Sequence, residues 1–136
     1  MITQKYINDI AYKIVGCAIE VHKHLGPGLL ESVYEPCLID ELVTGGLFVK
    51  SQIYVPVRYK NKDLGVQLKL DLLVNDLIIV EIKAVETMIP LYQAQLLSYL
   101  KLTGKPNGLL INFHCENITG HLVSLVTEEF AKLVKF

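Results

Sequence analysis

The stretch LKLDLLVNDLIIVEIK, residues 68–83, decides how the chain is interpreted. Two apolar runs of strand length flank the turn signal at residues 75–76, which predicts a β-hairpin. Each run carries an acid, Asp71 in the first and Glu81 in the second, and Lys83 follows Glu81 on the same face of its strand. Charges in such apolar surroundings are costly unless they are paired or bind a metal. The hairpin therefore contains a candidate metal site, with an ion pair to Lys83 that merely stabilises the hairpin as the alternative.

The register of this hairpin decides whether the two acids can meet. A two-residue turn at 75–76 would pair Asp71 with Val80, so Asp71 and Glu81 would project from opposite faces of the sheet. A shared site would then be impossible. We therefore predict a three-residue connection or a β-bulge that brings both carboxylates onto one face.

The pattern around the hairpin predicts helices before it and alternating elements after it. Apolar residues at helical spacing indicate a helix from about Thr3, its N-cap, to His24 and a second at about 29–43, separated by a Gly-Pro-Gly break. Period-two stretches indicate strands at about 48–58, 65–74 and 77–84. Pro90 then opens a helix to about Thr103, followed by strands at 108–113 and 120–126 and a short helix capped by Thr127.

This order predicts one α/β (α+β) domain over residues 1–136: a mixed sheet with an antiparallel meander, flanked by helices on both faces, with two helices N-terminal to the sheet. No apolar run is long enough to cross a bilayer, and the first residues lack the apolar core of a secretory signal, so we expect a cytoplasmic protein with no membrane partner. The three cysteines, Cys17, Cys37 and Cys115, are odd in number and widely separated, which favours reduced, structural thiols.

Positive charge is concentrated in one segment. The net charge of the chain is −1, yet between residues 50 and 70 five basic residues face a single acid, giving +4 there and −5 elsewhere: Lys50, Arg58, Lys60, Lys62 and Lys69 against Asp63. Such a segment could bind phosphates locally. From charge alone, a solvated hairpin with exposed lysines explains it equally well.

Two helical segments carry further candidates. Glu31 shares one face of the second helix with Tyr34, so it borders apolar surface and is a candidate third acid for the metal; the alternative is a first-turn glutamate favoured by the helix dipole. Gln95 and Tyr99 lie one turn apart on the third helix and could orient a phosphate or a catalytic water.

Together these pieces resemble the GxxExxY family, whose motif is present here as Gly28, Glu31 and Tyr34, and which is placed in the PD-(D/E)XK nuclease superfamily. The matching segments are residues 25–34, 71–74, 80–84 and 95–100. The resemblance implies a restriction-endonuclease-like fold and a nuclease dependent on Mg²⁺ (or Mn²⁺) that hydrolyses phosphodiester bonds of nucleic acid, DNA in preference to RNA. A non-catalytic module of the same fold that binds nucleic acid or protein is the alternative, and a homodimer is possible.

The resemblance also implies residue roles. Asp71, Glu81 and the carbonyl of Ile82 would hold the metal, with Glu31 as an added carboxylate. Lys83 would position or help deprotonate the attacking water. Further candidates for organising the phosphate and contacting substrate are Gln95, Tyr99, Tyr34 and Lys69. Lys69 and Leu70 stand where the family has an arginine and often a small residue, and His22, at a family position, is interpreted as a core histidine because it lies on the apolar face of the first helix.

Overall fold

The five strands of the computed structural model, which describes residues 1–136, form one sheet in the order β1-β2-β3-β4-β5. The strands are β1 (Val49–Tyr59), β2 (Lys62–Val74), β3 (Ile78–Lys83), β4 (Asn107–Asn112) and β5 (Leu122–Val126). The first three form an antiparallel meander, β4 lies parallel to β3, and β5 pairs antiparallel with β4. The predicted mixed sheet is confirmed.

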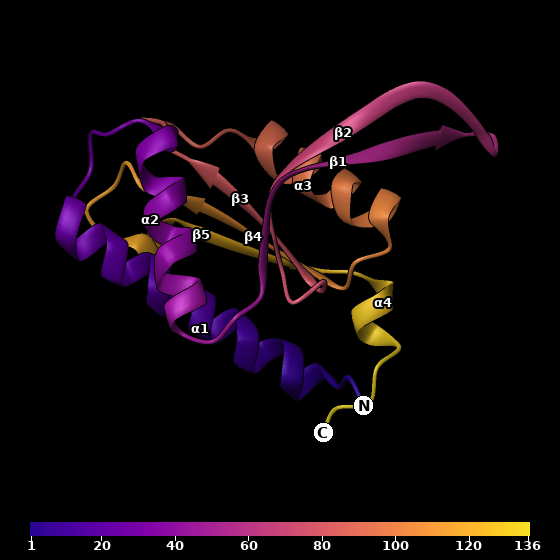
Figure 1. The fold of residues 1–136 in the computed structure, drawn as a ribbon, viewed down its shortest axis with the longest axis horizontal. Helices are drawn as coiled ribbons and strands as arrows, with labels where there is room; N and C mark the ends of the chain where they lie inside the picture. Colours follow the sequence, from indigo (N-terminus) through magenta and orange to yellow (C-terminus); the bar gives the residue numbers. More distant parts are fainter.

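Helices cover both faces of this sheet, as predicted (Figure 1). On one face lie α1 (Gln4–Leu25) and α2 (Glu31–Thr44), and their apolar residues join the sheet in a cluster of 18 buried side chains. On the other face α3 (Pro90–Thr103), the crossover between β3 and β4, covers a cluster of six. Thr3 caps α1 as predicted, because its hydroxyl accepts a hydrogen bond from the N–H of Tyr6 at 3.0 Å.

The connection between β2 and β3 has three residues. Val74 pairs with Ile78, which leaves residues 75–77 outside the ladder. Asn75 and Asp76 have φ values of 51° and 58°, in the left-handed region that Asn and Asp enter more readily than most residues. The prediction that rejected a two-residue turn is confirmed, and this register sets Asp71 opposite Glu81.

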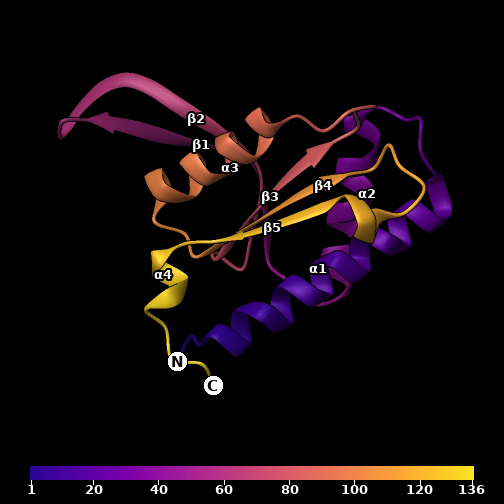
Figure 2. The same cartoon turned by 180° about the vertical axis from the view of Figure 1, so that it is seen from behind.

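The outer part of β1 and β2 leaves the body of the protein as a two-stranded ribbon, here called the arm, residues 53–70 (Figures 1 and 2). The two strands stay paired out to Tyr59 and Lys62, whereas β3 pairs with β2 only from Leu72 onward. The sheet therefore divides at Asp71, which is the first residue of β2 after the arm.

The C-terminal segment differs in detail from the prediction. A short 3₁₀ helix, η1 (Ile118–His121), takes the first two residues of the expected strand, because the side chain of Asn117 accepts a hydrogen bond from the N–H of Thr119 at 3.1 Å. Thr127 precedes the one-turn helix α4 (Glu128–Ala131), but its hydroxyl donates to the carbonyl of Lys105 at 3.0 Å instead of capping the helix. The three cysteines are free, and none of the helices has the length and apolar character needed to span a bilayer.

Candidate active site

Two carboxylates occupy the point where β2 and β3 separate. The strand ladder ends at the pair Leu72–Val80. Beyond it, the N–H of Ile82 donates to Oδ2 of Asp71 at 2.9 Å, and the N–H of Asp71 donates to Oε1 of Glu81 at 3.4 Å. Each carboxylate thus accepts from a backbone N–H of the neighbouring strand. This explains how two acids are accommodated inside apolar strands.

The backbone of β2 changes face at Asp71. Leu70 and Leu73 both belong to the core under α3, whereas Leu72 and Val74 belong to the core under α1 and α2. Regular alternation would place Leu70 with Leu72. Across the strand pair, Gln52 has a φ of 50°. This irregularity turns the Asp71 carboxylate toward β3 and also begins the arm.

The electrostatics of the pair favour a cation. Glu81 is 7% exposed, and burial, reinforced by the charge of Asp71, raises the pKa of Glu81 from 4.5 to about 8; Lys83 opposes this rise only in part. A buried carboxylate beside a second acid fits Mg²⁺, which takes one or two carboxylates and retains several waters. The residues present that suit this ion are Asp71, Glu81 and the carbonyl of Ile82.

The structure does not assemble Glu31 with the other two acids into a metal-binding group. No three acidic, histidine or cysteine side chains are spaced to hold a metal ion between them. Glu31 is exposed at the start of α2, and its Oε1 accepts a hydrogen bond from the N–H of Ala84, just beyond β3, at 3.2 Å. The expected set of three carboxylate ligands is therefore not formed in this arrangement.

Glu31 nevertheless shares an open cleft with Asp71. The cleft has a volume of about 270 Å³ and is lined from α2, β1, β2 and β3 by Glu31, Ser32, Glu35, Gln52, Lys69, Asp71 and Ile82. Lys69, a predicted substrate contact, therefore lies at the cleft. Residues of α2 form one wall of the cleft. Asp71 lines the cleft and also lies where β2 and β3 separate.

The opposite side of the acid pair meets α3. Lys83 is half-buried, with its Nζ 4.6 Å from the ring centre of Tyr92, and it forms no ion pair. Burial, followed by the charge of Glu81, raises the pKa of Tyr99. Nε2 of Gln95 donates to Oη of Tyr99 at 2.9 Å. The predicted glutamine–tyrosine pair is formed on α3, but Gln95 does not line the cleft.

Comparison with known families agrees with this geometry. A family model described as the PD-(D/E)XK nuclease superfamily matches residues 8–122. The chain belongs to the PD-(D/E)XK nuclease superfamily. No curated protein and no solved structure matches the chain. The matched residues run from α1 to the start of β5, so they include every residue of the cleft and the acid pair.

Three residues of this PD-(D/E)XK cleft were missed by the sequence reasoning: Ser32, Glu35 and Gln52. Oε1 of Glu35 accepts a hydrogen bond from Nε2 of Gln52 at 2.6 Å, and burial, with a contribution from the charge of Asp71, raises the pKa of Glu35. Glu35 lies four residues after Glu31, a spacing that places both on one helix face, and this signal was available. Gln52 carried no signal, because its left-handed backbone depends on the irregularity of the strand pair.

Tyr34, a predicted substrate contact, does not line the cleft of this PD-(D/E)XK domain and has a structural role instead. Its ring is completely buried and stacks on Phe113 with centres 4.6 Å apart. Its Oη donates to the carbonyl of Gly26 at 2.6 Å and accepts from the N–H of Leu29 at 3.2 Å. Tyr34 therefore fastens the loop that leads into α2. His22 is also structural, half-buried with Nε2 2.7 Å from the carbonyl of Cys115.

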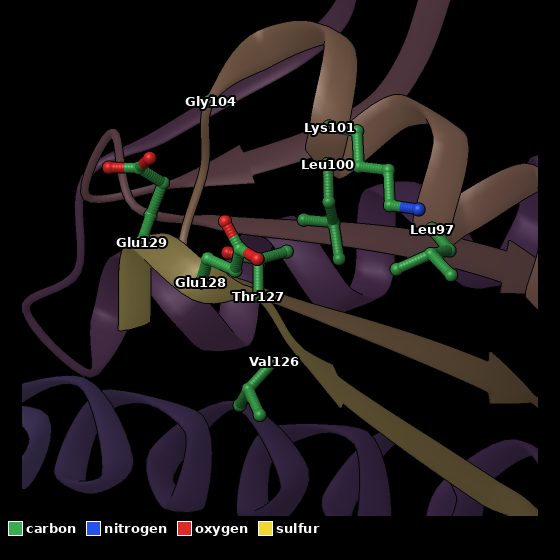
Figure 3. A pocket seen from close by; sticks show the side chains of 8 residues that line it. All are labelled: Leu97, Leu100, Lys101, Gly104, Val126, Thr127, Glu128 and Glu129. Carbon is green, nitrogen blue, oxygen red and sulfur yellow. The ribbon is translucent and has the colours of Figure 1, made fainter. Parts of the chain in front are cut away.

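A larger hollow lies away from the PD-(D/E)XK residues, at the C-terminal end of α3 (Figure 3). It measures about 470 Å³ and is surrounded by Leu97, Leu100, Lys101, Gly104, Val126, Thr127, Glu128 and Glu129. It contains neither the acid pair nor any other predicted site residue. The larger of these two hollows therefore does not coincide with the acid pair.

Proposed function

We propose that this chain is a metal-dependent nuclease that hydrolyses phosphodiester bonds of nucleic acid, DNA in preference to RNA, at the junction of β2 and β3. The observation that carries the proposal is the convergence of Asp71 and Glu81 in the strand gap, with Lys83 on the same face of β3 as Glu81. A stabilising ion pair does not account for this arrangement, because Lys83 pairs with neither acid. Membership of a nuclease superfamily supports the same reaction class.

We further assign the chain to the GxxExxY group, because each residue of that motif has a distinct role in the structure. Gly28 has a φ of 98°, a conformation that disfavours other residues. Glu31 begins α2 and lines the cleft. Tyr34 binds the backbone of the loop between α1 and α2. The motif therefore fixes the loop that positions a helix-borne carboxylate beside Asp71.

Mg²⁺ or Mn²⁺ is the proposed cofactor, with Asp71, Glu81 and the carbonyl of Ile82 as the residues that would hold it. When bound, the ion would polarise the phosphate and lower the pKa of an attacking water. Glu31 faces the cleft from α2 and would orient water there rather than bind the ion directly.

The remaining side chains would position the phosphate and the water. Lys83, on the same face of β3 as Glu81, would position the attacking water and stabilise the negative charge that develops on the phosphate oxygens. Lys69 would bind a neighbouring phosphate of the substrate as a point charge. Tyr99, held by Gln95, would donate a hydrogen bond on the α3 side. The proton lost by the attacking water would pass to solvent or to the oxygen that leaves the phosphorus.

The test is incubation of the purified protein with end-labelled single- and double-stranded DNA and RNA in the presence of Mg²⁺, Mn²⁺ or EDTA. We expect cleavage with either ion and none with EDTA. Asp71→Asn and Glu81→Gln should lose cleavage by a factor on the order of a hundred or more while keeping the wild-type circular dichroism spectrum. Asp40→Asn, the same change at an exposed position of α2, is the matched control and should cleave normally.

The outcomes separate the proposal from its alternative. Cleavage that survives EDTA or either acid substitution would contradict the assignment of the site. Nucleic-acid binding without cleavage under every condition would identify a non-catalytic binding module instead. Sedimentation velocity on the same samples tests whether the chain forms a homodimer.

A further inference from the structure

Figures 1 and 2 show the arm extending away from the body of the protein. The base of the arm borders the cleft, whose lining includes Gln52, Lys69 and Asp71. We infer that this ribbon binds the backbone of double-stranded DNA and holds the duplex across the active site. The inference rests on the proposed nuclease function and deepens it, because it names the surface that binds the substrate and the form of nucleic acid that this surface fits.

The cations of the arm have no acidic partners. Between residues 53 and 70 the chain carries four basic residues, Arg58, Lys60, Lys62 and Lys69, and one acid, Asp63, for a charge of +3. All four ion pairs of the structure lie outside the arm. Two of the lysines lie over aromatic rings: Nζ of Lys69 is 5.9 Å from the ring centre of Tyr54, and Nζ of Lys60 is 5.4 Å from that of Tyr59. These unpaired charges are available to phosphates.

The arm has a fixed base and a free outer half. Near the body, Ile53 and Val55 pack against the core under α3. Further out, every residue from 58 to 67 is exposed on both strands. A ribbon anchored at one end and unburied at the other can enter a groove while the active site stays in place.

The shape of the arm favours duplex DNA. The major groove of B-form DNA, about 12 Å wide, admits a two-stranded β-ribbon. The major groove of A-form RNA is too narrow and deep for this contact. Along β2, the nine residue-to-residue steps from Asp71 to Lys62 extend the ribbon by about 30 Å, which corresponds to roughly nine base pairs of B-form DNA. We therefore expect protected DNA on one side of the cut, over about this length.

The other candidate occupant is a protein, either a partner or a second copy of this chain. Leu64 and Val66 on the arm are 59% and 56% exposed, and apolar exposure of this kind also suits a protein surface. A second copy would bring an arm of charge +3 against the first, and the like charges would repel. The charge therefore favours DNA.

The experiment measures DNA binding separately from cleavage. The protein carries Glu81→Gln so that bound DNA remains intact. The probe is a labelled duplex of about 20 base pairs, twice the expected reach of the arm. Fluorescence anisotropy measures the affinity for this duplex over a range of KCl concentrations. Lys60→Gln with Lys62→Gln is the arm variant. Lys13→Gln with Lys23→Gln, at two exposed positions of α1, is the control with the same change in charge.

We expect the arm variant to bind the duplex about tenfold or more weakly at low salt. The slope of log K against log salt should also be smaller in magnitude by about 2, since each lost phosphate contact changes this slope by about 0.9. The control should bind as the parent does, and all variants should melt at the same temperature. A duplex RNA of the same length should compete poorly.

Three results would overturn the inference: an arm variant with unchanged affinity and salt slope, duplex RNA that competes as well as DNA, or a dimer dissociated by the arm substitutions without any change in DNA affinity. Cleavage by the wild-type protein, assayed in parallel, separates the two proposals. DNA binding that depends on the arm, without cleavage, would contradict the proposed nuclease function and support DNA binding by the arm. Cleavage together with DNA binding that does not depend on the arm would contradict only the inference about the arm.

Discussion

Glu81→Gln should change the pH dependence of stability as well as activity. Burial and the charge of Asp71 raise the pKa of Glu81 from 4.5 to about 8, so the folded protein holds a proton that the unfolded chain has released. Stability from this proton is fully present below pH 4.5 and is lost as the pH rises through 8. At about 1.4 kcal/mol for each pKa unit, the metal-free wild type should lose up to about 5 kcal/mol over this range.

Glutamine removes the titration while preserving the local hydrogen bond, because its Oε1 can still accept from the N–H of Asp71. The free energy of unfolding of the variant should therefore differ little from wild type near pH 5 and exceed it by several kcal/mol at pH 9. This is a large fraction of the stability of a typical domain, about 5 to 15 kcal/mol, so the difference is measurable.

The assay is urea unfolding in EDTA at intervals from pH 5 to pH 9, for wild type, Glu81→Gln and the control Glu86→Gln at an exposed position. At pH 8, Mg²⁺ should stabilise wild type, since the ion favours the ionised carboxylate, and should have much less effect on Glu81→Gln. Parallel pH profiles for wild type and Glu81→Gln would refute the reasoning, because the pKa of Glu81 would then not be raised by folding.

Three further substitutions test separate parts of the structure. Lys83→Met should retain Mn²⁺ binding by calorimetry but lose cleavage by a factor on the order of a hundred or more; retained cleavage would exclude a role in catalysis. Tyr34→Phe keeps the ring but loses the hydroxyl bond to Gly26, so it should lower the free energy of unfolding by about 1 to 2 kcal/mol in urea, and no loss would contradict the fastening role. Gly108→Ala should lower the melting temperature, at a cost of about 1 to 3 kcal/mol, because the added Cβ would lie 2.9 Å from Leu96; unchanged melting would show that α3 can shift.

Much of this fold was predictable because its signals are local. Helical spacing of apolar residues in α1 predicted side chains that are buried in the structure, among them Ile7, Ile14 and Ala18. The acids in β2 and β3 stood out because charge in an apolar strand needs a partner. A shared site for these acids required a three-residue connection or a β-bulge, since strand alternation permits only certain registers, and the observed register has the three-residue connection.

Other features depended on contacts between segments far apart in the chain. Tyr34 was an equally good candidate for the cleft until its ring was placed on Phe113, which is 79 positions away in the sequence. Glu31 was expected to join the acids as a metal ligand, whereas its Oε1 accepts a hydrogen bond from the N–H of Ala84 in the structure. The sequence by itself determined the elements, the pairing of β2 with β3 and the central acids, because these follow from periodicity and the cost of buried charge. Only the tertiary structure decided which side chains reach the cleft and that the arm stands free of the body, because packing selects among partners that the sequence leaves equivalent.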